Sequence, residues 1–246
     1  MARFFLPRTK IQDKRGIIDG QELDHLRRVL RLGPGDQITV FDDAGWEHEA
    51  VIRSFSIGQA EIDILQSFQV ERESSLEMTL ALGLTKGEKM DFVVEKATEL
   101  GIQTIAPFVS AYTVPKLDDS KIKKRIERWQ KVALSAAKQS GRTRIPEILM
   151  LCNFGELVRQ SFPNSVKLLF WEKETQRTLK DVRATEPQVR SLVLAIGPEG
   201  GFSEEEASMA LAHGFSSIRL GRRILRAETA AVSAISVVQF LWGDLG

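Results

Sequence analysis

The sequence predicts an α/β fold with a mostly parallel sheet, preceded by a smaller β-rich domain. Residues 1–72 contain β-leaning runs broken at hairpin spacing, whereas strand-like and helix-like segments alternate from residue 73 to residue 246. Alternation at this spacing is typical of parallel strands that are joined by helical crossovers and covered on both faces. The polar stretch 69–75 has no apolar periodicity and is therefore the expected linker.

The first domain should contain one short helix and three strands. Glycine, proline and aspartate at positions 33–36 favour a turn before the first strand, and residues 43–45 and 57–59 break the strands at hairpin spacing. A compact barrel or a curled antiparallel sheet would accommodate them. The helix is predicted over residues 22–32 and the strands over 37–41, 48–55 and 60–65.

The second domain should be larger. In its longest helix, Ile122, Ile126, Trp129, Ala133 and Ala137 recur every three or four residues and mark one apolar stripe. Strands are predicted over residues 78–84, 104–109, 166–171, 192–197 and 217–220, with a weaker one over 145–149. Helices are predicted over 89–100, 120–139, 154–160, 203–213 and 227–241, with a poorly defined one after residue 174.

Composition places the chain among ordinary soluble globular proteins. Of its 246 residues 43% are hydrophobic and 27% charged, and the net charge is +1, which argues against disordered, collagen-like and coiled-coil proteins. No apolar run reaches the roughly 18 residues of a membrane span, and no secretory signal is visible. Cys152 is the only cysteine, and His25, His48 and His213 lack ligand spacing. We therefore expect a cytoplasmic protein without metal and without a membrane partner.

Positive charge is concentrated around helix 120–139, here called the basic helix. Residues 116–144 include ten basic residues and only three acidic ones. A solvated surface helix and a binding face for an anionic partner both explain this excess. The basic residues are Lys116, Lys121, Lys123, Lys124, Arg125, Arg128, Lys131, Lys138, Arg142 and Arg144.

Residues 197–201, here called the glycine loop, follow a buried strand. Ser203 and Glu206 form a capping-box pattern for the next helix. Glycines at a strand-to-helix junction let the backbone approach a ligand at the carboxyl edge of the sheet, although a tight turn alone is the alternative. Glu199 and the acidic residues 204–206 disfavour phosphate and are compatible with a cationic ligand such as S-adenosylmethionine. Residues 85–89 match neither phosphate-binding fingerprint.

A second loop, residues 220–226, is strongly basic and is here called the basic loop. Arg222, Arg223 and Arg226 approach the N-terminus of the last helix, where positive charge is unfavourable. These side chains should therefore be compensated by an anion. Glu228 is one internal candidate, and a simple pair between Arg226 and Glu228 is the alternative to a ligand.

These segments together resemble a known family. IGPEGGF, LGRRILRAETA, LTKGEKMDFVVEKATELG and AAKQSGRTRIPEI are similar to motifs of the bacterial 16S ribosomal RNA uridine-N3 methyltransferases, which belong to the SPOUT (trefoil-knot) class. RFFLP and HLRRVLRLGPGDQITVFDDAG resemble the PUA-like RNA-binding domain of that family. The resemblance covers the whole chain. It implies a PUA-like β-barrel over residues 1–72 and an S-adenosylmethionine-binding SPOUT knot over residues 73–246 that works as a homodimer on 16S rRNA, in the small ribosomal subunit.

The resemblance also implies site residues. Those expected at the cofactor are Trp171, Ile196, Gly197, Glu199, Gly200, Leu220, Gly221, Ile224, Leu225 and Thr229. Those expected at the RNA are Arg3, Arg27, Arg28, Arg31, Lys124, Arg128, Lys131, Gln139 and Arg142. The expected catalytic residues are Arg226, Glu228 and Arg142.

The chemistry of uracil suggests roles for two of them. N3 carries a weakly acidic proton, so Arg226 is expected to stabilise the N3 anion and Glu228 to accept the proton. A catalytically inactive RNA-binding factor and an enzyme that uses ATP or NAD remain alternatives, which cofactor binding would separate. The last helix is apolar on more than one side, so it is covered by a second copy or by its own domain.

Overall fold

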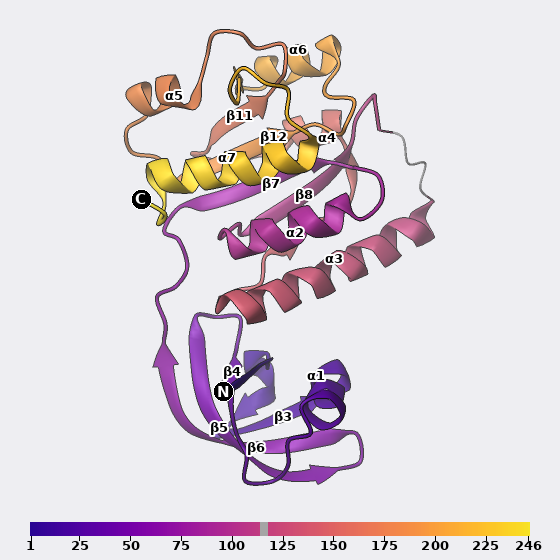
Figure 1. Cartoon of the computed structure of the whole chain (residues 1–246), viewed down its shortest axis with the longest axis vertical. Coiled ribbons are helices and arrows are strands. Elements are labelled where there is room, and N and C mark those ends of the chain that lie inside the picture. Colours follow the sequence, from indigo (N-terminus) through magenta and orange to yellow (C-terminus); the bar gives the residue numbers. More distant parts are fainter. Residues whose placement is uncertain (114–117) are drawn as a thin grey trace. The chain divides into compact units, whose positions relative to one another are not determined.

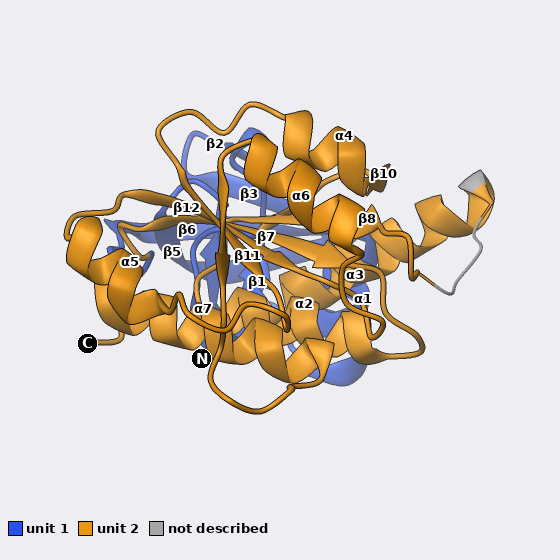
Figure 2. Cartoon of the chain, turned by 90° about the horizontal axis from the view of Figure 1, so that it is seen from above, with its two compact units in different colours: residues 1–73, 137–145 blue, residues 74–136, 146–246 orange. Residues whose placement is uncertain are grey.

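The computed structural model describes residues 1–113 and 118–246. The chain forms two compact units, the first made of residues 1–73 and 137–145 and the second of residues 74–136 and 146–246 (Figure 2). Lys116, one of the ten basic residues counted above, lies outside the described residues. In the part of the chain that the structure describes, no helix is long and apolar enough to cross a membrane.

The first unit is built on one six-stranded sheet with the order β1-β4-β5-β6-β3-β2. Strand β1 pairs with β4 in parallel, whereas the other pairs are antiparallel. Of the two predicted forms, a compact barrel or a curled antiparallel sheet, the second is thus modified by one parallel pair. Its elements are β1 (Ala2–Phe5), η1 (Arg8–Lys10), β2 (Ile11–Gln12), β3 (Arg15–Asp19), α1 (Gly20–Asp24), η2 (His25–Val29), β4 (Gln37–Phe41), β5 (Trp46–Ser56) and β6 (Gln59–Gln69).

The core of this unit lies between the curved sheet and the helical turns α1 and η2. Buried side chains alternate along β3 and β6, as the twofold period of a strand requires. Leu23 and Leu26 of the helical turns belong to the same buried cluster as Phe4, Ile38 and Ile62. The helical turns begin at Gly20, two residues before the expected start, and end at Val29, three residues before the expected end. The second turn is π-helical.

The second unit contains a seven-stranded, all-parallel sheet with the order β10-β8-β7-β12-β11-β13, and β9 pairs beside β10 on β8. Its strands are β7 (Glu77–Gly83), β8 (Thr104–Val109), β9 (Glu147–Ile148), β10 (Cys152–Asn153), β11 (Val166–Phe170), β12 (Ser191–Ile196) and β13 (Phe215–Ile218). Its helices are α2 (Lys89–Glu99), α3 (Asp119–Ser140, whose last four residues count with the first unit), α4 (Phe154–Arg159), α5 (Leu179–Thr185), α6 (Glu204–Ala212) and α7 (Ala227–Trp242).

Helices cover both faces of this sheet. Helices α2 and α7 lie side by side, and α7 packs on β12 (Figure 1). Helices α4 and α6 pack together, and their Phe154, Leu157 and Ala207 join Phe108 and Val193 of the strands in one buried cluster. Because all strands are parallel, the loops after β11, β12 and β13 leave from the same edge of the sheet.

Candidate active site

A cavity of about 600 Å³ lies at the carboxyl edge of the parallel sheet. Three loops line it: residues 171–172 after β11, the glycine loop after β12, and residues 219–226 after β13. Its size is within the range of small-molecule sites, and its place is where doubly wound sheets bind their ligands.

Most residues expected at the cofactor line this cavity. They are Trp171, Ile196, Gly197, Glu199, Gly200, Leu220, Gly221, Ile224 and Leu225, together with the catalytic candidate Arg226. Thr229 is exposed and does not line it. Helix α7 begins at Ala227, so Ala227 and Ala230, three residues apart, share the side that faces the cavity, and Thr229 falls outside it.

The glycine loop is held by close backbone approaches. A Cβ on Gly83, at the end of β7, would lie 2.5 Å from the backbone nitrogen of Pro198, so a side chain there would push the loop away. Gly201 has a φ of +71°, and a Cβ on it would lie 2.5 Å from Glu172 Oε1. Glycine is therefore required at both positions.

Gly200 faces an aromatic residue. A Cβ on it would lie 2.6 Å from Cβ of Tyr112, the only tyrosine of the chain, whose side chain is 52% exposed. The space beside Gly200 is thus partly filled by protein, and close approach to a ligand is not the only reason for glycine here.

An ion-pair cluster joins three elements, and two of its members, Lys89 and Glu199, line the cavity, whereas the catalytic candidate Glu228 does not. The ammonium of Lys89, at the start of α2, lies 3.1 Å from Glu199 Oε1 and 3.5 Å from Glu228 Oε2. The hydrogen bond to Glu199 is the main cause of a raised pKa for Lys89. Burial alone would raise the pKa of Glu199, but hydrogen bonds from the Lys86 N–H, from its own N–H and from Lys89 together lower it. Both partners of the pair are therefore charged at neutral pH.

The basic loop has no such compensation. Arg222, Arg223 and Arg226 are exposed, and among residues 1–113 and 118–246 no carboxylate oxygen forms an ion pair with them. The alternative pair between Arg226 and Glu228 is not formed, because Glu228 turns to Lys89 instead. Three cations at one edge of the cavity are left available for an anionic ligand.

Two further polar atoms point to a ligand. Trp171 Nε1 and Arg219 Nε are buried donors that find no hydrogen-bond acceptor within the described part of the protein, and both residues line the cavity. A buried donor without an acceptor is costly, so an acceptor is expected from a bound molecule or water.

Comparison with known proteins identifies the family. A model of the RNA methyltransferase domain matches residues 72–239, and a model of the RNA methyltransferase PUA domain matches residues 18–65. Ribosomal RNA small subunit methyltransferase E of Bacillus subtilis is 32% identical over 98% of this chain and 96% of its own length. The chain belongs to this RNA methyltransferase family.

Two solved relatives carry a bound cofactor. A methyltransferase of Legionella pneumophila in complex with S-adenosylmethionine is 33% identical, with a TM-score of 0.91 over 99% of this chain and 98% of that one. Ribosomal RNA small subunit methyltransferase E of Neisseria gonorrhoeae bound to S-adenosylmethionine is 34% identical, with a TM-score of 0.88 over both full chains. The expected family is confirmed. The expected fold class, an α/β domain of SPOUT type preceded by a PUA-like domain, is confirmed as well, and the threading of the knot stays a prediction.

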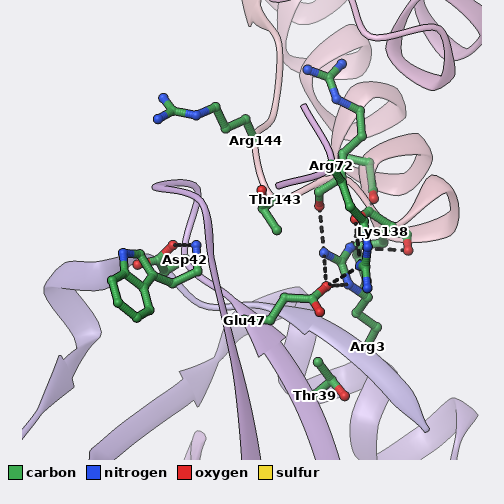
Figure 3. Close-up of polar contacts among 12 residues, drawn as sticks. Arg3, Thr39, Asp42, Glu47, Arg72, Lys138, Thr143 and Arg144 are labelled. Carbon is green, nitrogen blue, oxygen red and sulfur yellow. Dashed lines mark hydrogen bonds and ion pairs between the residues drawn. The ribbon is translucent and has the colours of Figure 1, made fainter. Parts of the chain in front are cut away.

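The structure changes the interpretation of Arg3 and Arg142, which were expected at the RNA. The Arg3 guanidinium donates to Glu47 and to the carbonyl oxygens of Ala137 and Arg142, as Figure 3 shows in part. The Arg142 guanidinium is buried and binds Glu73 at 2.6 Å. Both groups have internal partners in the first unit. These contacts give both residues a role in the architecture of the unit, and their contact with RNA and, for Arg142, a part in catalysis stay predictions.

The other residues expected at the RNA are accessible to solvent. Arg128 of the basic helix forms an ion pair with Asp91 of α2, which neutralises part of its charge. Arg27 lies over the ring of Phe55, with its guanidinium carbon 4.9 Å from the ring centroid. The exposed candidates are Arg27, Arg28, Arg31, Lys124, Arg128, Lys131 and Gln139.

The sequence did not single out Lys89. It follows a loop that matches no phosphate-binding fingerprint, so nothing in the local pattern marked it. A lysine at the first position of a helix, where the dipole disfavours a cation, was the available signal.

Proposed function

We propose that this chain transfers a methyl group from S-adenosylmethionine to N3 of a uridine in small-subunit ribosomal RNA. The observation that carries the proposal is the cavity formed by the three loops after β11, β12 and β13, in a chain that matches cofactor-bound methyltransferases over its whole length. The cytoplasm, where small ribosomal subunits are made, is the proposed place of action.

The cavity suits this cofactor. S-adenosylmethionine carries an activated methyl group on a positively charged sulfonium, which the carboxylates of Glu172 and Glu199 favour. Trp171 Nε1 supplies a buried donor for a polar atom of the ligand. Residues 197–201 of the glycine loop line the cavity, so their main-chain groups can contact the ligand.

Arg226 and Glu228 are the proposed reacting side chains. Arg226 lines the cavity, and its planar guanidinium can face the uracil oxygens on which negative charge develops when N3 loses its proton. The Glu228 carboxylate would accept that proton, directly or through a water, which leaves N3 with the lone pair that attacks a methyl group. Bound S-adenosylmethionine would supply this methyl group from its sulfonium, with the neutral thioether of S-adenosylhomocysteine as the leaving group. Because N3 lies on the pairing edge of the base, a paired uridine must leave its helix first.

The exposed arginines and lysines are the proposed RNA contacts. Such side chains bind phosphates without reading sequence, while shape and an unpaired base supply specificity. A homodimer is proposed as the working form. It is supported by three exposed apolar side chains that a second copy would cover, Val237 and Phe240 on α7 and Phe92 on the adjacent α2.

The test is methyl transfer to small ribosomal subunits that lack the modification, followed by mass mapping of the nucleosides. A methyl group on uridine N3 is expected, and no transfer, or transfer to another atom, would refute the proposal. Arg226→Lys should keep cofactor binding by calorimetry and lose most turnover, because lysine lacks the planar fork. A strictly monomeric mass by light scattering would refute the dimer.

A further inference from the structure

Lys89 connects a residue that lines the cavity, Glu199, to Glu228 of α7, which does not line it. Its ammonium reaches Glu199 of the glycine loop and Glu228 of α7, so both carboxylate oxygens lie within 3.5 Å of one nitrogen. The three residues come from α2, from the loop after β12 and from α7, which are far apart in the sequence.

The position of Lys89 indicates a structural role at the cavity. It is the first residue of α2, where the helix dipole disfavours a cation, and it lines the cavity. Two carboxylates held this close repel each other unless a cation stands between them. Without Lys89 the two carboxylates would lack this cation, and Glu199 would keep the hydrogen bond from the Lys86 N–H.

Glu228 has no other anchor in the described residues. Its Oε2 is buried and accepts no hydrogen bond there, so the ion pair with Lys89 is what fixes the direction of the carboxylate. A proton acceptor must be held at a defined place to act on one atom of a substrate.

We propose that Lys89, which lines the cavity, is a positioning residue: it holds the Glu228 carboxylate, which lies behind the cavity lining, by bridging it to Glu199 of the glycine loop. This inference rests on the proposed function, in which Glu228 accepts the N3 proton. Lys89 itself takes no proton and touches no reacting atom.

Lys96 provides a matched control. It lies on the same helix, its side chain has the same 33% exposure as that of Lys89, and it also bridges two carboxylates, those of Glu95 and Glu99. Lys96 does not line the cavity. Removal of one surface ammonium can thus be separated from removal of the bridge.

The experiment compares Lys89→Met, Lys89→Arg, Glu228→Gln and Lys96→Met. Single-turnover methyl transfer is measured at saturating S-adenosylmethionine, and cofactor affinity is measured by calorimetry without RNA. Lys89→Met should lower the rate of methyl transfer at least tenfold, with a smaller loss of cofactor affinity. Lys89→Arg should recover most of the lost rate, and Lys96→Met should keep the rate within twofold of the wild type. In the Glu228→Gln variant, adding Lys89→Met should lower the rate of methyl transfer by less than a further threefold, because the two residues act as one unit.

Crystal structures give a readout besides activity. In Lys89→Met the Glu228 carboxylate should leave its place beside Glu199, whereas in Lys96→Met it should not move. An unmoved carboxylate, an unchanged rate for Lys89→Met, or losses that multiply in the double variant would each overturn the inference. An inactive wild type would refute the proposed function instead, and the position of Glu228 in the crystals would still decide the bridge.

Discussion

Substitution of Glu73 should cost the first unit much of its stability. One oxygen of this carboxylate accepts from Nε and Nη2 of Arg142, at 3.0 and 2.6 Å. The other accepts from the backbone N–H groups of Thr143 and Arg144, at 3.0 and 3.1 Å. Glu73→Ala removes all four contacts at once.

The burial of the pair sets the size of the effect. The side chain of Arg142 is 4% exposed and that of Glu73 is 16% exposed, so solvent screens the pair little. Removing one partner of a buried ion pair typically costs about 3–5 kcal/mol, because the other charge stays buried. The double variant Glu73→Leu/Arg142→Met should recover only part of this loss. The N–H of Thr143, a fully buried residue, would still lack its acceptor, at about 1–3 kcal/mol.

Hydrogen exchange of the β4 and β5 amides measures the stability of this unit within the whole chain. A global unfolding curve would mix the two units, so it is not the right measure. Protection should fall by about a hundredfold to a few thousandfold, since 1.4 kcal/mol corresponds to a factor of ten. Arg72→Gln is the control: Arg72 is half-exposed in its pair with Glu47, so about 1 kcal/mol or less is expected. A Glu73→Ala loss no larger than that of the control would refute the reasoning.

Three further outcomes are expected. Gly83→Ala should weaken S-adenosylmethionine binding in calorimetry at least tenfold, because its Cβ displaces Pro198, whereas Gly33→Ala, with nothing within 4 Å, should not; equal affinities would contradict this. Neutralising Lys124 and Lys131 should lower the salt slope of RNA binding by roughly 0.7–0.9 per lost phosphate contact, and Arg128→Gln by less because Asp91 already pairs with it; an unaltered slope would mean a merely solvated helix. Burial lowers the pKa of His48, so the unfolded chain binds the proton first, and the stability of the first unit should fall as pH drops below about 6.5. His48→Gln should flatten this dependence in the hydrogen-exchange protection factors of the β4 and β5 amides, and an unchanged slope would exclude His48 as its source.

The sequence predicted the second unit well because its signals are local. Strands β8 and β11 and helices α2 and α7 lie within a residue or two of their expected bounds, since buried apolar runs and helical stripes need no knowledge of neighbours. Strand β13 begins two residues earlier than expected because Phe215 and Ser216 pair with β11, a contact that only the fold creates.

The first unit was less predictable. Strands β1, β2 and β3 were missed, and the edge strand β1 depends on its parallel pairing with β4. Arg142, which follows the basic helix, was expected at the RNA from the family resemblance. Its burial depends on Glu73, about seventy residues earlier in the chain, so no local pattern could show it.

At the cavity, local sequence patterns predicted the two loops, whereas the ion pairs between distant residues appear only in the structure. The glycine loop and the basic loop were found because each carries an unusual composition within a few residues. The separate expectations of a cation near Glu199 and an anion near Arg226 are joined by the structure, which puts both loops on one cavity. The glycine loop and the basic loop do not neutralise each other. Glu199 and Glu228 pair with Lys89, and no carboxylate of the described residues forms an ion pair with the arginines of the basic loop. A cavity in which opposite charges are kept apart suits a positively charged methyl donor and an anionic RNA that meet within it.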